Sequence, residues 1–170
     1  CSSTTTVNIV VGPSAVTDYL NATVNTTLSS SVATNDVYQA GSTFTKLSGP
    51  SNGSATITSA TGALSYTPTT NFTGTDSLTY KVCLPSPNGT VCSTTTTYIT
   101  IGPVAVNDTA STPANTAKTI DVLANDGCST CLPAVLSDAT HGTVSVGVDG
   151  KMVYEPNPGF TGTDTFTYII

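Results

Sequence analysis

Apolar and polar residues alternate with a period of two along most of the chain, and apolar residues do not recur at helical spacing. Clear examples are the segments TVNIVV, SATITS, GALSYTP, DSLTYKV and TTYITI, which are rich in Thr, Val, Ile and Tyr and are bounded by Gly, Pro and Asn. This pattern predicts short β-strands with one buried face. In the first hundred residues we expect seven strands, at 15–18, 28–33, 43–47, 54–58, 63–67, 77–82 and 94–101.

The segments between these strands carry turn residues, as in SGPSNG and SATG. The chain holds ten prolines and fourteen glycines, which disfavour helices. Seven short strands in about ninety residues are typical of a β-sandwich with Greek-key connections. The predicted fold class is therefore all-β.

The chain also repeats itself. Nine residues between Pro13 and Asp36 recur ninety positions later without a gap, and YTPTTNFTGTDSLTY (66–80) returns as YEPNPGFTGTDTFTY, 88 positions on. A unit of this length is the size of one small domain. We therefore expect one sandwich at 13–102 and a second at 103–170.

The opening segment CSSTTTVNIVVGP closely matches CSTTTTYITIGP at 92–103. Residues 1–12 are therefore expected to be the closing strand of a preceding repeat, and the second repeat is expected to lack its own last strand. Two arrangements explain this: a segment of a longer covalent array, or a separate subunit whose residues 1–11 complete the next chain by donor-strand addition. We favour the array, because Cys1 corresponds to Cys92 and then has its partner upstream.

Composition limits the classes of partner. The net charge is −6, charged residues make up 8% of the chain, all four cations are lysines, and serine and threonine together account for 55 of 170 residues. Binding to nucleic acid or to an anionic membrane needs clustered Lys and Arg, so both are excluded as partners. No run of eighteen apolar residues is present, so we expect no membrane-spanning segment.

Residues typical of active sites are not repeated between the two units. His141 is the only histidine, and Asn52 takes its place in the first unit; Glu155 is likewise replaced by Thr67. A nucleophilic triad needs its base, and paired acid–base carboxylates need each other. We therefore predict that the protein is not an enzyme and that it has no catalytic residue.

The second unit resembles the bacterial immunoglobulin-like or cadherin-like tandem repeat of large secreted surface adhesins. The resemblance rests on PVAVNDTASTPANTAKTIDVLANDG, HGTVSV and DGKMVYEPNPGFTGTDTFTY in that order, and the first unit, with VC and VCSTTTTYITI, resembles the cysteine-bearing variant found in giant adhesins of gliding bacteria. The family fold is an immunoglobulin-like β-sandwich of about seven strands.

The resemblance implies a location and a role. It implies an extracellular protein of the cell surface that serves as a stalk or spacer in a repetitive adhesin or filament, with neighbouring repeats and an unknown surface or glycan ligand as partners. Family members also lie between catalytic domains of secreted enzymes, so a carbohydrate-binding accessory module is a further alternative. The chain has no tryptophan, and most tyrosines occupy repeated, core-like positions, which offers little to a sugar platform.

Several repeated residues have structural interpretations within such a sandwich. The spacing Asp-x-x-x-Tyr is typical of the corner that enters the sixth strand, where the tyrosine hydroxyl bonds to backbone. We expect phenylalanine anchors in the core and, beside them, glycines with positive φ. The corner residues are Asp76, Tyr80, Asp164 and Tyr168, the anchors are Phe72 and Phe160, and the glycines are Gly74 and Gly162.

Four cysteines are predicted to form two local disulfides. Cys83 and Cys92 flank the loop LPSPNGTV, and a bridge across it would close the hairpin between the last two strands. Cys128 and Cys131 form a second bridge or half of a zinc site, and no further soft ligand is close in sequence. The extracellular location implied by the family favours disulfides.

The remaining candidates are a calcium site and two O-glycosylation sites. Related repeats hold calcium at an Asn-Asp motif and after LAND, so Asn107, Asp108, Asn125 and Asp126 are candidate calcium ligands, with capping and turn roles as the alternative. We expect no other cofactor. Ser77 and Thr109 lie in the sequences DSL and DTA, which resemble bacterial O-glycosylation sites.

Overall fold

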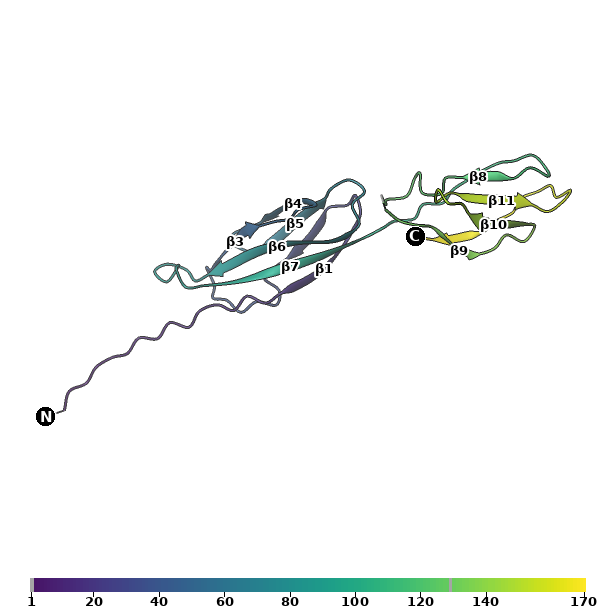
Figure 1. Cartoon of the computed structure of the whole chain (residues 1–170). Helices are drawn as coiled ribbons and strands as arrows, with labels where there is room; N and C mark the ends of the chain where they lie inside the picture. Colours follow the sequence, from purple (N-terminus) through teal and green to yellow (C-terminus); the bar gives the residue numbers. More distant parts are fainter. Residues whose placement is uncertain (1, 129) are drawn as a thin grey trace. The chain divides into compact units, whose positions relative to one another are not determined.

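The structure is a computed structural model that describes residues 2–128 and 130–170. Its described residues form twelve β-strands and no helix (Figure 1). Contacts divide the chain into two compact units. Unit 1 holds the chain up to Ala22 with Thr26–Thr69 and Gly74–Ile101, and unit 2 holds Thr23–Asn25, Thr70–Thr73 and Gly102–Ile170. In the described part of the chain, no helix is long and apolar enough to cross a membrane.

Unit 1 is a sandwich of two sheets. The four-stranded sheet has the order β1-β7-β6-β3 and the three-stranded sheet has the order β2-β5-β4. β5 pairs antiparallel with β2 and β4, and β6 pairs antiparallel with β3 and β7. The strands are β1 (Asp18–Thr23), β2 (Leu28–Ser31), β3 (Thr43–Ser48), β4 (Gly53–Ile57), β5 (Ala63–Pro68), β6 (Gly74–Cys83) and β7 (Cys92–Gly102).

The period-two pattern explains how unit 1 builds its core. In β5, Leu64, Tyr66 and Pro68 are buried while the residues between them are exposed. The same alternation buries one face of β6 and of β7. Removing each large apolar side chain from water stabilises the fold by about 1.5 to 3 kcal/mol. The largest fully buried side chains of unit 1 include Tyr66, Tyr80, Phe44, Leu78, Ile99 and Ile101.

Unit 2 repeats part of this plan. Its three-stranded sheet has the order β10-β11-β8, which matches β4-β5-β2, and its two-stranded sheet pairs β12 with β9, which matches β6 with β3. Met152 and Val122 are its fully buried apolar side chains. The strands are β8 (Lys118–Ile120), β9 (Ala134–Ser137), β10 (Gly142–Val146), β11 (Met152–Pro156) and β12 (Thr167–Ile169).

Unit 2 has no described counterpart of β1 or of β7. In unit 1, β1 has β7 as its neighbour in the sheet, and β7 lies between β1 and β6. Residues 108–113, ninety positions after β1, form no strand. The physical reason is that an edge strand needs ladder hydrogen bonds to a neighbour, and the described residues of unit 2 supply none in the place of β7. Tyr168, which corresponds to the fully buried Tyr80, is accordingly only half-buried.

One predicted strand is wrongly placed. The expected strand at 15–18 is instead β1, which begins at Asp18 and runs to Thr23. Ahead of it, Ser14 makes only an isolated bridge to Val37, and the Val16 N–H donates to a side chain, the Asp36 carboxylate, over 2.7 Å. Bonds to side chains replace a strand ladder there. Residues 2–12 have no strand partner among the described residues, so their closing-strand role stays a prediction.

Candidate functional site

The first disulfide closes the hairpin between β6 and β7. Cys83 and Cys92 are directly opposite each other at the end of the ladder, with Cα atoms 4.1 Å apart, and their sulfurs are bonded. Beyond the bridge, the Leu84 N–H donates to the Val91 carbonyl, and Leu84 is buried. The bridge therefore ties the longest two strands of unit 1 at the point where they would otherwise fray.

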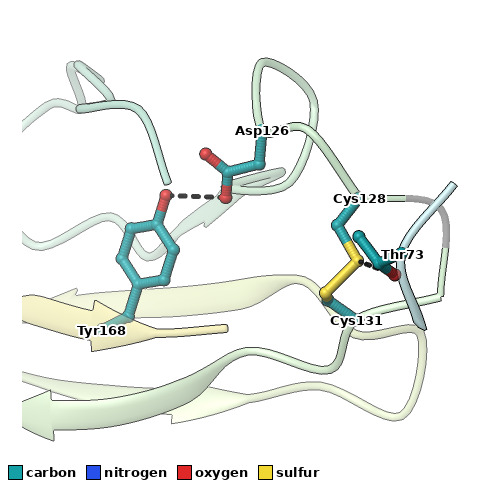
Figure 2. Close-up of a disulfide and its surroundings, with 5 residues drawn as sticks. All are labelled: Thr73, Asp126, Cys128, Cys131 and Tyr168. Carbon is teal, nitrogen blue, oxygen red and sulfur yellow. Dashed lines mark hydrogen bonds between the residues drawn. A yellow bond between two sulfur atoms is a disulfide. The ribbon is translucent and has the colours of Figure 1, made fainter. Parts of the chain in front are cut away.

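The second disulfide lies in the loop after β8. Cys128 and Cys131 are bonded with Cα atoms 5.8 Å apart, and the Cys128 side chain is buried (Figure 2). The Thr73 hydroxyl, also within unit 2, lies 3.6 Å from the Cys128 sulfur. Zinc binds cysteine as the free thiolate, and these two sulfurs are bonded to each other. In this structure the two cysteines therefore form a disulfide and not half of a zinc site. The predicted upstream pairing of Cys1 falls outside the described residues.

Asp76 holds the loop before β4 by accepting four hydrogen bonds. Its carboxylate accepts from the backbone N–H groups of Ser51, Asn52 and Ser77 over 2.8–3.0 Å and from the Tyr66 hydroxyl over 3.1 Å. Burial alone would raise the pKa of Asp76, but these donors outweigh it and hold the pKa below its ordinary value. A carboxylate whose lone pairs are all engaged in this way has a structural role.

Asp164 repeats this arrangement in unit 2. Its oxygens accept from the N–H groups of Thr140, His141 and Thr165 over 2.8–3.1 Å and from the Tyr154 hydroxyl over 3.0 Å. The same donors lower the pKa of Asp164 against the effect of burial. His141 thus contributes its backbone to a turn, as Asn52 does in unit 1.

The His141 ring packs on Phe160. The two rings are stacked, with centroids 4.4 Å apart and planes within 8°, and the histidine side chain is half exposed. Phe72 and Phe160 are both only partly buried, so the expectation that they anchor the core is wrong. Their position in a loop beside a turn, rather than on a buried strand face, is the physical reason. Glu155 is exposed on β11.

Gly74 and Gly162 adopt the backbone conformation expected of them, with φ of 122° and 141°. A side chain at such φ is strained.

The tyrosine corner of unit 1 joins two carboxylates. The Tyr80 hydroxyl lies 2.8 Å from the Val32 carbonyl and 2.8 Å from the Asp36 carboxylate. The second carboxylate, that of Asp18, is buried and accepts from the Thr97 hydroxyl over 2.8 Å. Burial raises the pKa of Asp18, the Thr97 hydrogen bond opposes the rise, and the charge of Asp36 adds to it. Burial and Asp36 also raise the pKa of Tyr80.

The corresponding corner of unit 2 brings candidate calcium ligands to one hydroxyl. Tyr168 has its oxygen 2.9 Å from Asp108, 3.1 Å from Asp126 and 3.1 Å from the Val122 carbonyl (Figure 2 shows the Asp126 contact). Burial raises the pKa of Tyr168, and the two carboxylates raise it further. Asp76, Tyr80, Asp164 and Tyr168 therefore all take part in hydrogen-bond networks that fasten loops to strands.

The other candidate ligands make turn contacts. The Asn125 amide donates to the Asn107 carbonyl over 3.2 Å, and Asp126 accepts from the Val106 N–H over 2.7 Å. Unit 1 has the same pair of bonds, made by Asn35 and Asp36. The oxygens of Asp126 thus serve protein donors, as a capping role requires. In the described residues no three His, Cys, Asp or Glu side chains are grouped as metal ligands, and calcium binding stays a prediction.

The glycosylation candidates are both accessible. Ser77 is exposed on β6, opposite Tyr98 of β7, and Thr109 is exposed in the segment that follows Asp108. Their modification stays a prediction.

Sequence reasoning missed one buried polar contact, that of Asp18 with Thr97. Thr97 lies at an inward position of the β7 alternation, and it is fully buried. Ala15, Thr17 and Asp18 contact Ser93, Thr95 and Thr97 in that order, so β1 and β7 run in the same direction. The available signal was the recurrence of Asp18 as Asp108.

This geometry defines tandem, disulfide-bonded sandwiches whose conspicuous polar residues fasten turns. The sequence profile described as bacterial Ig domain matches residues 11–101 and, a second time, residues 100–170. The chain therefore belongs to the bacterial Ig domain family, which confirms the predicted resemblance and the all-β, tandem Ig-like fold. It is a structural or adhesion-type repeat, and its family and disulfides are consistent with an extracellular protein.

No curated protein matches the chain. Solved structures that match include an endo-fucoidan hydrolase from glycoside hydrolase family 107, at 18% identity over 92% of this chain and 26% of that chain, with a TM-score of 0.38. Protocadherin gammaB7 EC3-6 matches at 10% identity over 90% of this chain and 45% of that one, with a TM-score of 0.44. The chain thus spans about a quarter of the length of the hydrolase and less than half of the length of the protocadherin.

Proposed function

We propose that this chain is a stalk or spacer segment of a long, repetitive protein on the bacterial cell surface, and that it carries out no catalysis. The observation that carries the proposal is the tandem arrangement of two family domains, matched at 11–101 and at 100–170. Repetition of one fold adds length to a protein. Catalysis would instead depend on a particular set of residues at one site.

The side-chain contacts support a mechanical role. Asp76 and Asp164, the carboxylates that stand out in the repeat, each accept three backbone N–H groups and a tyrosine hydroxyl. They have no lone pair left to act as a general base. The two disulfides close short loops, which opposes local unfolding and proteolysis outside the cell.

The proposal is tested in the bacterium that makes the protein. Antibodies against residues 13–102 should label intact cells, and the reduced, denatured native protein should be much larger than the 17.1 kDa of this chain. Deletion of this segment from the gene should shorten the surface structure seen by electron microscopy while leaving its assembly intact. Labelling only after lysis, or a surface structure of unchanged length, would overturn the stalk role.

A second candidate is a filament subunit joined by strand exchange. Val7, Ile9 and Val11 are 78–82% exposed, and in the match to β7 they correspond to Thr97, Ile99 and Ile101, which are at most 2% exposed. The β12 edge of unit 2, which corresponds to β6, has no neighbour in the place of β7 among the described residues. Residues 2–12 of one copy thus have the side-chain pattern that this edge accepts.

Strand exchange predicts a difference between neighbouring residues of one segment. Ile9→Asp puts a charge at an inward position and should abolish concentration-dependent oligomers of the 170-residue polypeptide in sedimentation. Val10→Asp is the matched control, because Val10 corresponds to the outward Thr100, and it should leave the oligomers unchanged. A monomeric polypeptide at all concentrations, or an equal effect of both variants, would remove this candidate.

A further inference from the structure

Three tyrosines of unit 1 are exposed, and two of them, Tyr19 and Tyr98, form a pair. The third, Tyr38, packs edge-on against Phe44. Tyr19 of β1 and Tyr98 of β7 are 78% and 40% exposed. Their rings are stacked, with centroids 5.6 Å apart and planes within 15°. Ninety positions after Tyr19 the second repeat has Thr109, so this aromatic residue is not repeated between the two units. The prediction that most tyrosines occupy repeated, core-like positions does not extend to this pair.

The surroundings of the pair are rich in hydroxyl groups. On β7 the outward positions beside Tyr98 are Thr96 and Thr100, which alternate with buried Thr97, Ile99 and Ile101. On β6, Ser77 is directly opposite Tyr98 in the ladder. Two further threonines of β6, Thr75 and Thr79, are opposite Thr100 and Thr96. The pair therefore stands on a sheet face covered by short hydroxyl side chains (Figure 1 shows β7 between β1 and β6).

The same face is almost uncharged. Among the residues of β1, β6 and β7, Asp18 and Asp76 are buried, and Lys81 is the one other charged residue. Lys81 is opposite Thr94, four residues along β7 from Tyr98. An acidic or basic ligand would find no charge partner beside the rings, and an aliphatic protein surface would have to cover hydroxyl groups without satisfying them.

We propose that Tyr19 and Tyr98 form a binding platform for a neutral polysaccharide. A pyranose ring has an apolar CH face, which packs on an aromatic ring, and equatorial hydroxyls, which exchange hydrogen bonds with Ser and Thr hydroxyls. Both kinds of group meet on this face, with Ser77, Thr96 and Thr100 next to the rings. The inference goes beyond the stalk role, because a spacer needs no ligand. It assigns polysaccharide binding to the exposed face of the sheet that carries Tyr19 and Tyr98.

Substitutions that the fold tolerates test the platform. Tyr19→Thr installs the residue type of the equivalent position in the second repeat, and Tyr98→Thr extends the threonines of β7. The probes are immobilised β-glucan, mannan and xylan, with alginate as the acidic comparison. The wild-type 170-residue polypeptide should be retained by at least one neutral probe, and the Tyr19→Thr/Tyr98→Thr variant should bind it about tenfold more weakly or worse.

The control variant is Tyr19→Phe/Tyr98→Phe, which keeps both rings and should retain most of the affinity. Unchanged far-ultraviolet circular dichroism and urea midpoints establish that the threonine variant is folded. The chain has only seven tyrosines, so a tyrosine-labelled sample gives few ring signals in nuclear magnetic resonance. Those of Tyr19 and Tyr98 should shift on titration with the bound oligosaccharide.

Three results would overturn the proposal. The first is that the wild type binds none of the neutral probes, and the second is that the wild type and the threonine variant bind equally. The third is that only alginate retains the wild type. Self-association of the wild type that the threonine variant loses, without polysaccharide binding, would assign the pair to contacts between copies instead. None of these results bears on the stalk role, which is decided by surface labelling and by the length of the surface structure.

Discussion

At the scale of single residues, two aspartates of unit 1, Asp76 and Asp18, have pKa values shifted in opposite directions. Asp76 is surrounded by donors, which lower its pKa, whereas Asp18 is buried beside Asp36, and its pKa is raised. The difference follows from the backbone, because three N–H groups converge on Asp76. Asp18 has side-chain donors, chiefly the Thr97 hydroxyl, and these do not outweigh burial and the charge of Asp36.

Replacing Asp76 should destabilise unit 1 strongly. Asp76→Ala leaves the N–H groups of Ser51, Asn52 and Ser77 without their acceptor, and we expect the free energy of unfolding to fall by about 2 to 4 kcal/mol. Urea denaturation of the 170-residue polypeptide measures it. Thr75→Ala, on an exposed position of the same strand, is the control and should change stability by less than about 0.5 kcal/mol. Equal effects of the two variants would refute the structural role of Asp76.

The pH dependence of this contribution has a definite sign. Because the folded pKa of Asp76 lies below its ordinary value of 3.8, its stabilisation is complete above that value and is lost as pH falls through the folded pKa. The Asp76→Ala variant should therefore differ most from the wild type at neutral pH and least in strong acid. A difference that stays constant down to about pH 2 would contradict this.

Asp18 should show the opposite dependence. Its raised pKa means that the ionised form is disfavoured in the folded state, so the wild type gains stability as pH falls through the folded pKa toward 3.8. Asp18→Asn keeps an acceptor for Thr97 without the charge, and it should unfold at a higher urea concentration than the wild type at pH 7. This advantage should shrink as the pH approaches 4. Lower stability of the variant at pH 7 would show that the ionised group is needed.

At the scale of elements, pairing decides which segments become strands. β6 and β7 form a ladder from Gly74 opposite Ile101 to Cys83 opposite Cys92, longer than the predicted strands at 77–82 and 94–101. Residues 108–113 correspond to β1 in the repeat but form no strand, and the neighbour they would need is a strand in the place of β7. Period-two alternation predicts which face of a strand is buried, but it does not supply the neighbour.

Removing the hairpin disulfide should weaken unit 1. Cys83→Ser/Cys92→Ser opens a loop of eight residues, which in the chain-entropy account costs about 2.5 kcal/mol. Hydrogen exchange followed by mass spectrometry should show faster exchange in β6 and β7. In the control, Cys128→Ser/Cys131→Ser, the change should be confined to unit 2. An unchanged exchange rate in β6 and β7 would mean that the ladder alone holds the hairpin.

At the scale of the whole chain, the two units should differ in stability although they share a family. In unit 1 Tyr80 and Leu78 are fully buried, whereas the corresponding Tyr168 and Phe166 are only partly buried in unit 2. In the 170-residue polypeptide we therefore expect the Val153 amide of β11 to exchange at least about tenfold faster than the Val82 amide of β6. Nuclear magnetic resonance of the labelled polypeptide measures both rates. Equal protection would show that unit 2 is complete without a strand in the place of β7.

The sequence alone determined the features that depend on local pattern and on repetition. Alternation predicted the all-β fold, the 88- to 90-residue offset predicted two domains of one kind, and the short loop LPSPNGTV placed Cys83 near Cys92. The repeat also identified Asp76 and Asp164 as structural, because a residue kept in both copies at the same turn serves the fold that both copies share.

Tertiary structure alone decided what depends on contacts between distant segments. Asp18 meets Thr97 across 79 residues and Tyr19 stacks on Tyr98 across the same pair of strands, and no local pattern contains that pairing. The position of β1, the half-burial of Phe160 and the outward direction of two tyrosines follow from which strands lie side by side. Period-two alternation sets only the two faces of each strand, and the neighbouring strands then determine which side chains meet and which remain in water.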